Sequence, residues 1–269
     1  MTQAELVFLK LGGSLITYKD KPMTPHLDVI DQISNEIAIA LKEKPDLKLV
    51  IGHGSGSFGH VAASLHKTHL GGESKAYWQG FAEVWRDART LNQIIVQHLS
   101  NAGLPVIAFP PSAGLIAVNK AAQSWDVGPL TLALYHGLLP IVQGDVVFDQ
   151  HLGGTIFSTE QIFTYLARKL HPSRILLAGL DAGVYADPFN AKNIHTKITP
   201  EDLESILPGL SGSETVDVTG GMQSKVRLMI SLIQEMPELK IQIFSGKKPG
   251  NILYALTGGQ LGTLLTSYK

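Results

Sequence analysis

The most informative stretch of this chain is Gly52-His-Gly-Ser-Gly-Ser-Phe-Gly-His60. It follows a short apolar run, residues 47–51, which predicts a buried strand, and a helical pattern comes after it. Because its glycines carry no Cβ, several backbone N–H groups are able to turn toward an anion. His60 adds an imidazole that donates to anionic oxygens and titrates near neutral pH. One such loop is also typical of a tight turn, but strand, glycine loop and helix together favour a phosphate-binding site.

A second loop of the same kind, Lys10-Leu-Gly-Gly-Ser14, follows the apolar run of residues 6–9. Its spacing differs from the Walker pattern, which argues against a P-loop NTPase. The first loop fits the dinucleotide-binding pattern only formally, since no convincing acidic residue stands at the end of the next strand. Two glycine loops on successive strands suggest two phosphate groups that face each other, as when a phosphoryl donor meets a phosphorylated acceptor.

The composition is that of an ordinary globular protein. The 269 residues are 44% hydrophobic and 17% charged, and the net charge of −1 offers no overall attraction to nucleic acid or anionic membrane. The absence of cysteine excludes disulfides, thiolate catalysis and cysteine-ligated metals. No apolar segment approaches the roughly 20 residues that span a bilayer, and the N-terminus lacks signal-peptide features. We therefore expect a cytoplasmic protein with no nucleic-acid or membrane partner.

Strand-like runs alternate with helical patterns through most of the chain, which predicts an α/β fold with a mainly parallel sheet. The patterns predict helices over 25–42, 77–102, 159–170 and from 221 onward, and a buried strand over 104–109. A hairpin over 146–157 is expected to turn at Gly153-Gly154, and Ser158 with Gln161 forms a capping box. We expect two lobes that share one continuous sheet, so that the boundary between them, near residue 179, is not sharp. The N-terminal lobe, 1–179, would hold the acceptor site, and the C-terminal lobe, 180–269, would hold the nucleotide site.

For phosphoryl transfer, the protein mainly has to align the reactants and place positive charge around the transferred group, and it does little covalent chemistry itself. Lys10 and Lys225 each adjoin a glycine loop at the end of an element, and Lys19 lies in a loop beside Lys21, so the choice between those two stays open. Asp145 follows a strand where α/β proteins place their ligand crevice, and we expect it either to cap a turn or to orient the lysines.

Other residues allow two interpretations each. Asp181 and Asp187 flank Gly183 and Tyr185 in a loop, where turn chemistry or nucleotide contact would explain them. The helical stripe of Phe81, Val84 and Trp85 is either core or the wall of an apolar pocket beside His60. The remaining histidines, His53 among them, show no metal-ligand spacing and are interpreted as structural or surface residues.

In their order along the chain, these motifs resemble those of the amino acid kinase superfamily and, within it, of the isopentenyl phosphate kinases. The matching stretches are Lys10–Ser14, Gly54–His60, Gly144-Asp145-Val-Val, Asp181–Pro188 and Asp217–Lys225, so the resemblance covers essentially the whole chain. His60, which ends the loop Gly52–His60, is the mark of a narrower group, and the related fosfomycin kinases share it. The resemblance implies a three-layer α/β/α sandwich, a homodimer, and transfer of the γ-phosphoryl group of ATP to isopentenyl phosphate.

The resemblance also implies a role for each matching residue. The catalytic residues would be Lys10, Lys19, His60, Asp145 and Lys225. The acceptor would be bound by Ser55, Gly59, His60, Gly154, Phe81, Val84 and Trp85. ATP would be bound by Lys10, Gly12, Gly13, Ser14, Gly56, Asp181, Gly183, Tyr185, Asp187, Gly221 and Lys225. Mg²⁺ would be held mainly by phosphate oxygens, with no protein residue as a metal ligand.

Two other functions remain to be compared. A fosfomycin-type kinase, or another kinase of small phosphates or phosphonates, would need a more polar pocket around residues 77–88. A non-catalytic nucleotide-binding sensor or storage protein on the same fold would not need the full set of lysines with His60 and Asp145.

Overall fold

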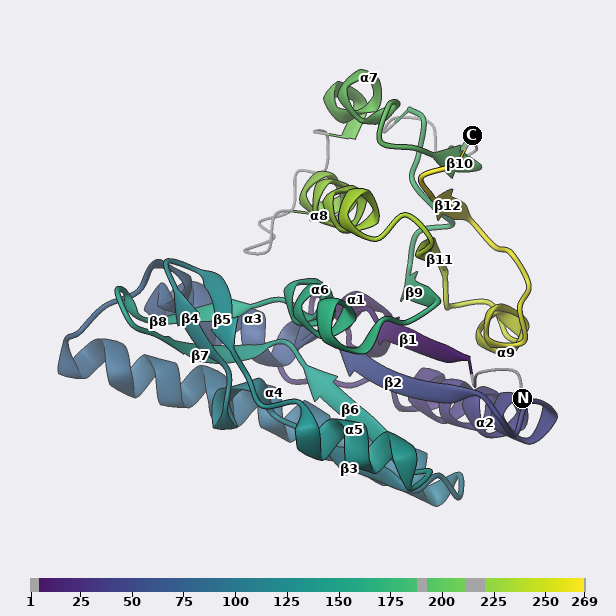
Figure 1. Ribbon diagram of the computed structural model, residues 1–269. Helices are drawn as coiled ribbons and strands as arrows, with labels where there is room; N and C mark the ends of the chain where they lie inside the picture. The colour runs from purple at the N-terminus through teal and green to yellow at the C-terminus, as the bar shows by residue number, and fades with distance from the viewer. Residues whose placement is uncertain (1–4, 188–192, 211–220, 269) are drawn as a thin grey trace.

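The computed structural model describes residues 5–187, 193–210 and 221–268. Its centre is an eight-stranded sheet, and the first strand of the chain lies in the interior of that sheet (Figure 1). In spatial order the strands are β10 (Lys197–Ile198), β12 (Thr263–Leu265), β11 (Lys240–Ser245), β9 (Arg174–Gly179), β1 (Leu6–Leu11), β2 (Lys48–His53), β6 (Leu139–Gln143) and β3 (Val106–Ala108). All neighbouring pairs are parallel except β11 with β12, so the prediction of a mainly parallel sheet is confirmed.

Helices cover both faces of this sheet. Val7 and Leu9 of β1 pack with α2 (Leu27–Glu43), α4 (Lys75–Asn101) and α9 (Asn251–Leu256) on one face. Phe8 points the other way and packs with α5 (Gly128–Tyr135), α6 (Thr159–Leu170) and α8 (Gly221–Glu235). Since side chains alternate along a strand, one strand supplies both cores. The three-layer α/β/α sandwich is confirmed.

A second, four-stranded sheet lies beside the first and holds the order β5 (Ala121–Ser124), β4 (Ile116–Val118), β7 (Asp145–Asp149) and β8 (Gly153–Phe157). The β7–β8 hairpin was expected, but its tip is at residues 150–152, and Gly153-Gly154 begin β8 instead of forming the turn. Gly154 is required for packing instead of for the turn, because a Cβ there would lie 2.6 Å from the Phe81 ring.

The predicted buried strand over 104–109 is wrong in extent and in burial. Only β3 forms, and Ile107 is 39% exposed because β3 is the edge strand of the main sheet. Short helical segments complete the described chain: α1 (Gly13–Ile16), α3 (Gly56–His66) and α7 (Leu203–Ile206), with 3₁₀ turns at Thr68–Leu70, Pro111–Ala113 and Leu207–Leu210. None of the helices in the described ranges is long and apolar enough to cross a bilayer.

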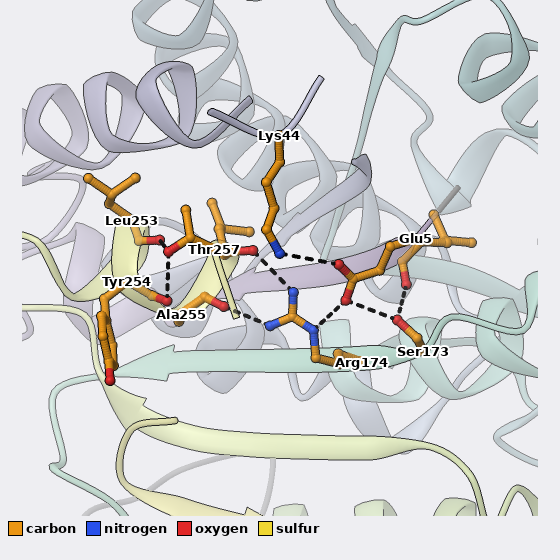
Figure 2. A network of polar contacts seen from close by, with 10 residues as sticks. Glu5, Lys44, Ser173, Arg174, Leu253, Tyr254, Ala255 and Thr257 are labelled. Atoms are coloured by element: carbon orange, nitrogen blue, oxygen red, sulfur yellow. Dashed lines mark hydrogen bonds and ion pairs between the residues drawn. The ribbon is translucent and has the colours of Figure 1, made fainter. Parts of the chain in front are cut away.

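The short helix α9 is fixed at both ends by charged side chains. At its N-terminus the Glu36 carboxylate accepts the backbone N–H groups of Gly250, Ile252 and Leu253 at 2.9–3.1 Å. At its C-terminus Arg174 donates to the carbonyls of Ala255 and Leu256, and Figure 2 shows how Glu5 holds the same guanidinium in place. A carboxylate at a helix N-terminus and a cation at its C-terminus complement the helix dipole. Arg174 thereby joins the start of β9 to the chain just before β1.

Candidate active site

The two glycine loops touch each other at the ends of β1 and β2. A Cβ on Gly13 would lie 2.6 Å from the Gly56 nitrogen, and a Cβ on Gly54 would lie 2.8 Å from the Gly13 nitrogen. Such distances are too short for any side chain, so only glycine permits this approach. Thr17, a buried residue that sequence reasoning missed, ties the loops together by donating to the Gly13 carbonyl and accepting from the Ser57 amide.

Four backbone amides at these loops have no acceptor within the described residues: those of Gly13, Ser14, Ser55 and Gly56. The α3 helix begins at Gly56, so its N-terminal partial positive charge is directed to the same place. The sequence suggested that His60 ends the glycine loop, but in the structure His60 lies within the α3 helix. Unpaired amides at a helix N-terminus form a binding site for phosphate oxygens.

These loops open into a cavity of about 700 Å³. It extends from the ends of β1 and β9 to the space between α3, α4 and β8. Most of the residues singled out from the sequence line it: Lys10, Gly12, Gly13, Ser14, Lys19, Ser55, Gly59, His60, Val84, Asp145, Asp181, Gly221 and Lys225. Lys19 lines the cavity, whereas the Lys21 ammonium lies over the Tyr18 ring, 5.1 Å from its centroid, which favours Lys19 of the two.

Other predicted residues do not line this cavity, and they lie elsewhere for identifiable reasons. Gly154 packs against Phe81, and Gly183 packs against Thr263, where a Cβ would lie 2.6 Å from the hydroxyl oxygen. Phe81 is buried, while Trp85 is half-buried. The predicted residues outside the cavity lining are Gly56, Phe81, Trp85, Gly154, Gly183, Tyr185 and Asp187. Residues 217–220 of the last motif lie outside the described residues, so that part of the motif has no structural description.

The charge centre of the cavity is an ion pair between Lys10 and Glu160, in which the lysine ammonium donates to the carboxylate. Both side chains are almost wholly buried. Burial alone would raise the pKa of Glu160, but the charges of Lys10 and Lys225 outweigh it and hold that pKa below its usual value. Glu160 also stands in the first turn of α6, where the helix dipole favours a carboxylate.

Asp145 has different partners from those expected. Its carboxylate accepts the backbone amides of Ser112 at 3.1 Å and Val146 at 2.9 Å, and Glu160 is the residue that contacts Lys10. Glu160 therefore contacts Lys10 directly, whereas the role of Asp145 in orienting the lysines stays a prediction. Burial raises the pKa of Asp145 to about 6, although hydrogen bonds from Ser112 and Val146 partly offset this.

The sequence did not identify Glu160 as a site residue, because a glutamate in the first turn of a helix has an ordinary structural explanation. It lies inside the Ser158–Gln161 capping box, which the structure confirms, and a glutamate there is ordinary helix chemistry. A second missed residue is Lys120, at the tip of the β4–β5 hairpin, whose position on the cavity wall depends on pairing between distant strands.

The end of the cavity between α3, α4 and β8 is apolar. Ala63, Val84, Ala88 and Ile156 line it, and Phe81 packs behind them in a cluster with Ala62, Tyr77 and Val146. The α4 stripe thus has both of the roles left open from the sequence, because Val84 lines the cavity and Phe81 belongs to the core. A cavity with cations and free amides in its middle and an apolar end suits an amphiphilic phosphate ester.

Comparison with known proteins agrees with this geometry. The model of the amino acid kinase family matches residues 5–245. The chain is 32% identical to an isopentenyl phosphate kinase of Methanocaldococcus jannaschii, with 96% of this chain and 97% of the relative aligned. It is also 32% identical to one from Methanothermobacter thermautotrophicus, over 97% and 99% of the two chains.

Solved structures show the same fold. An isopentenyl phosphate kinase structure superposes with a TM-score of 0.82 at 27% identity, covering 97% of this chain and 100% of the other. A product complex of the Thermoplasma acidophilum isopentenyl phosphate kinase superposes with a TM-score of 0.75 at 23% identity, covering 97% and 99% of the two chains. By the match to the family model and the identity to these relatives over nearly the whole chain, this chain belongs to the isopentenyl phosphate kinases of the amino acid kinase family.

Proposed function

We propose that this chain transfers the γ-phosphoryl group of ATP directly to isopentenyl phosphate, giving isopentenyl diphosphate and ADP. An oxygen of the acceptor phosphate forms the new bond to the γ-phosphorus, and the bond from that phosphorus to the β,γ-bridging oxygen breaks. The observation that carries the proposal is the contact between Gly13 and Gly56, because it brings the unpaired amides of Gly13 and Ser14 to the same cavity as that of Ser55. Two phosphates bound at these loops would lie in line for transfer.

We assign the residues by their place in the cavity. His60 and the Ser55 amide would hold the acceptor phosphate, and the apolar end at Val84 would hold its hydrocarbon chain. Lys10 and Lys225, whose charges both act on Glu160, would stabilise the negative charge that moves to the β,γ-bridging oxygen. Residues 1–179 would thus carry mainly acceptor contacts and residues 180–269 mainly nucleotide contacts.

The proposal includes magnesium. In the described residues there is no group of three or more His, Asp or Glu side chains placed to hold a metal, Glu160 is paired with Lys10, and Asp145 accepts two amides. These residues do not form a protein site for Mg²⁺, and we propose that it enters on the phosphate oxygens of ATP, where it would neutralise their charge. The homodimer and the cytoplasmic location stay predictions.

The test is a steady-state assay of ADP release with ATP, Mg²⁺ and a panel of acceptors. Isopentenyl phosphate should be turned over, whereas acetylglutamate, uridylate and fosfomycin should not. Preference for fosfomycin would favour the phosphonate kinases, and tight ATP binding without transfer to any acceptor would favour a sensor. The apolar lining by Ala63, Val84, Ala88 and Ile156 supports the isoprenoid over the phosphonate.

A further inference from the structure

His53 is the last residue of β2 and stands immediately before Gly54 and Ser55 of the Gly52–His60 loop. Its side chain is fully buried and does not line the cavity, whereas the next residues, Gly54 and Ser55, do. The imidazole nevertheless uses both ring nitrogens. Nδ1 lies 3.0 Å from the Gly54 carbonyl oxygen, and Nε2 lies 3.0 Å from the amide nitrogen of Asn92 in α4.

These two contacts fix the tautomer of His53. The Asn92 side-chain nitrogen is a donor only, so Nε2 must accept and carries no proton. The proton of the neutral ring is then on Nδ1, which donates to the Gly54 carbonyl. The backbone of His53 is fixed as well, since its carbonyl accepts from the Thr159 hydroxyl at 2.6 Å and the Gly144 amide at 2.9 Å.

Holding the Gly54 carbonyl determines where the Ser55 amide points. The two groups belong to one peptide unit, the described chain has no cis peptide bond, and in a trans peptide C=O and N–H point in opposite directions. Because His53 draws the carbonyl toward the buried side, the Ser55 N–H is directed toward the cavity, and this amide has no acceptor within the described residues. Glycine at 54 would otherwise let the peptide rotate at little steric cost.

We propose that His53 is a positioning residue for phosphoryl transfer, which prevents the Gly54–Ser55 peptide from flipping and keeps the Ser55 N–H aimed at the bound phosphate. Through Asn92 it also ties this peptide to α4, the helix that lines the apolar end of the cavity. The effect on turnover rests on the proposed function, whereas the direction of the Ser55 amide does not.

Two substitutions separate positioning from packing. In His53→Asn the side-chain amide takes the place of Nδ1 and can still donate to the Gly54 carbonyl, but the contact with Asn92 is lost. In His53→Gln the longer side chain reaches Asn92, but the contact with Gly54 is lost. If His53 only fills space, the larger glutamine is the better replacement. If it holds the peptide, asparagine is the better one.

The first measurement is kcat/KM for isopentenyl phosphate beside urea unfolding of each variant. We expect His53→Gln to lose about 100-fold, the usual effect of losing one donor to a developing oxyanion, and His53→Asn to stay within about tenfold of the wild type. Near-normal kcat/KM in His53→Gln, or losses that follow stability in both variants, would overturn the proposal.

The second measurement does not need turnover. Inorganic phosphate is titrated into isotope-labelled protein, and the amide resonance of Ser55 is followed. It should shift in the wild type and in His53→Asn but stay unchanged in His53→Gln. A shift without turnover of any acceptor would reject the proposed function and keep the positioning role, and an unresponsive Ser55 in the wild type would reject the positioning role.

Discussion

Gly13 and Gly56 lie in backbone contact, and a Cβ on Gly13 would come within 2.6 Å of the Gly56 nitrogen. The site depends on this contact because it sets the spacing between the two phosphate-binding loops. A residue at either position is therefore constrained by the other, although they are distant in the sequence.

Gly13→Ala should separate the loops. Overpacking of this kind costs about 1–3 kcal/mol of stability, and the displaced amides should lower kcat by a larger factor than the stability loss explains. Steady-state kinetics and urea unfolding measure the two effects. Gly209→Ala is the control, since its Cβ would meet only an oxygen at 3.7 Å, and it should change neither. Normal kcat in Gly13→Ala would show that the loop contact is unimportant for transfer.

Glu160→Gln should leave Lys10 buried beside a neutral amide, with its ammonium no longer fixed. We expect kcat to fall on the order of 100-fold, because a small misplacement of a catalytic group has effects of this size. Glu160→Asp keeps the charge with a shorter side chain and should retain more activity than the glutamine variant. Equal activity in the two variants would contradict a role based on charge.

His60→Ala should weaken the contact with the acceptor phosphate. The loss of a charge-assisted contact in the transition state amounts to about 2–4 kcal/mol, or on the order of 10²-fold in kcat/KM for the acceptor. The KM for ATP should change little, because in the proposed function His60 holds the acceptor phosphate and not ATP. A variant that loses ATP affinity instead would place His60 in the nucleotide site.

His53 should make folding stability depend on pH. Burial lowers its pKa to about 4, from an ordinary value of 6.5, while a hydrogen bond to Gly54 acts weakly in the opposite direction. The unfolded chain therefore binds more protons between pH 6.5 and 4, so this contribution is complete above pH 6.5 and is lost as the pH falls toward 4. Its upper size is about 3 kcal/mol.

The measurement is urea unfolding of the wild type and of His53→Asn across this pH range. The difference in stability between the two proteins isolates the contribution of His53 from that of Asp145. Burial raises the pKa of Asp145 to about 6, so Asp145 favours folding at low pH, and this contribution is lost as the pH rises from about 4 to 6. Parallel stability curves for the two proteins would show that His53 titrates normally.

Lys120→Gly should stabilise the fold. Asn119 and Lys120 both have positive φ, 49° and 63°, at the tip of the β4–β5 hairpin, a turn in which the second position strongly favours glycine. Relief of the left-handed conformation should outweigh the added entropy of the unfolded chain by about 0.5–1 kcal/mol. Gln93→Gly, in the middle of α4, should instead destabilise by about 1 kcal/mol. A lower melting temperature for Lys120→Gly would contradict this reasoning.

The sequence predicted the elements and the loops better than the contacts between them. The capping box at Ser158 and the β1 and β2 strands were readable because their signals are local. The exposure of β3 was not readable, since an apolar run at a sheet edge resembles one at its centre. Asp145 and Glu160 show the same limit in the site: both carboxylates were visible, but which of them meets Lys10 depends on residues 150 positions apart.

The position of β1 limits how the molecule is able to close around its substrates. It is paired with β2 on one side and β9 on the other along almost its whole length. A hinge within residues 1–179 would have to break one of these ladders, and a hinge at the predicted lobe boundary near residue 179 would have to break the ladder between β9 and β11. Either is too costly to occur in each catalytic cycle. Any tightening around bound ATP must therefore come from segments at the edge of the main sheet, such as the β7–β8 hairpin or α8. Rotation of one domain relative to the other is not expected in this kinase.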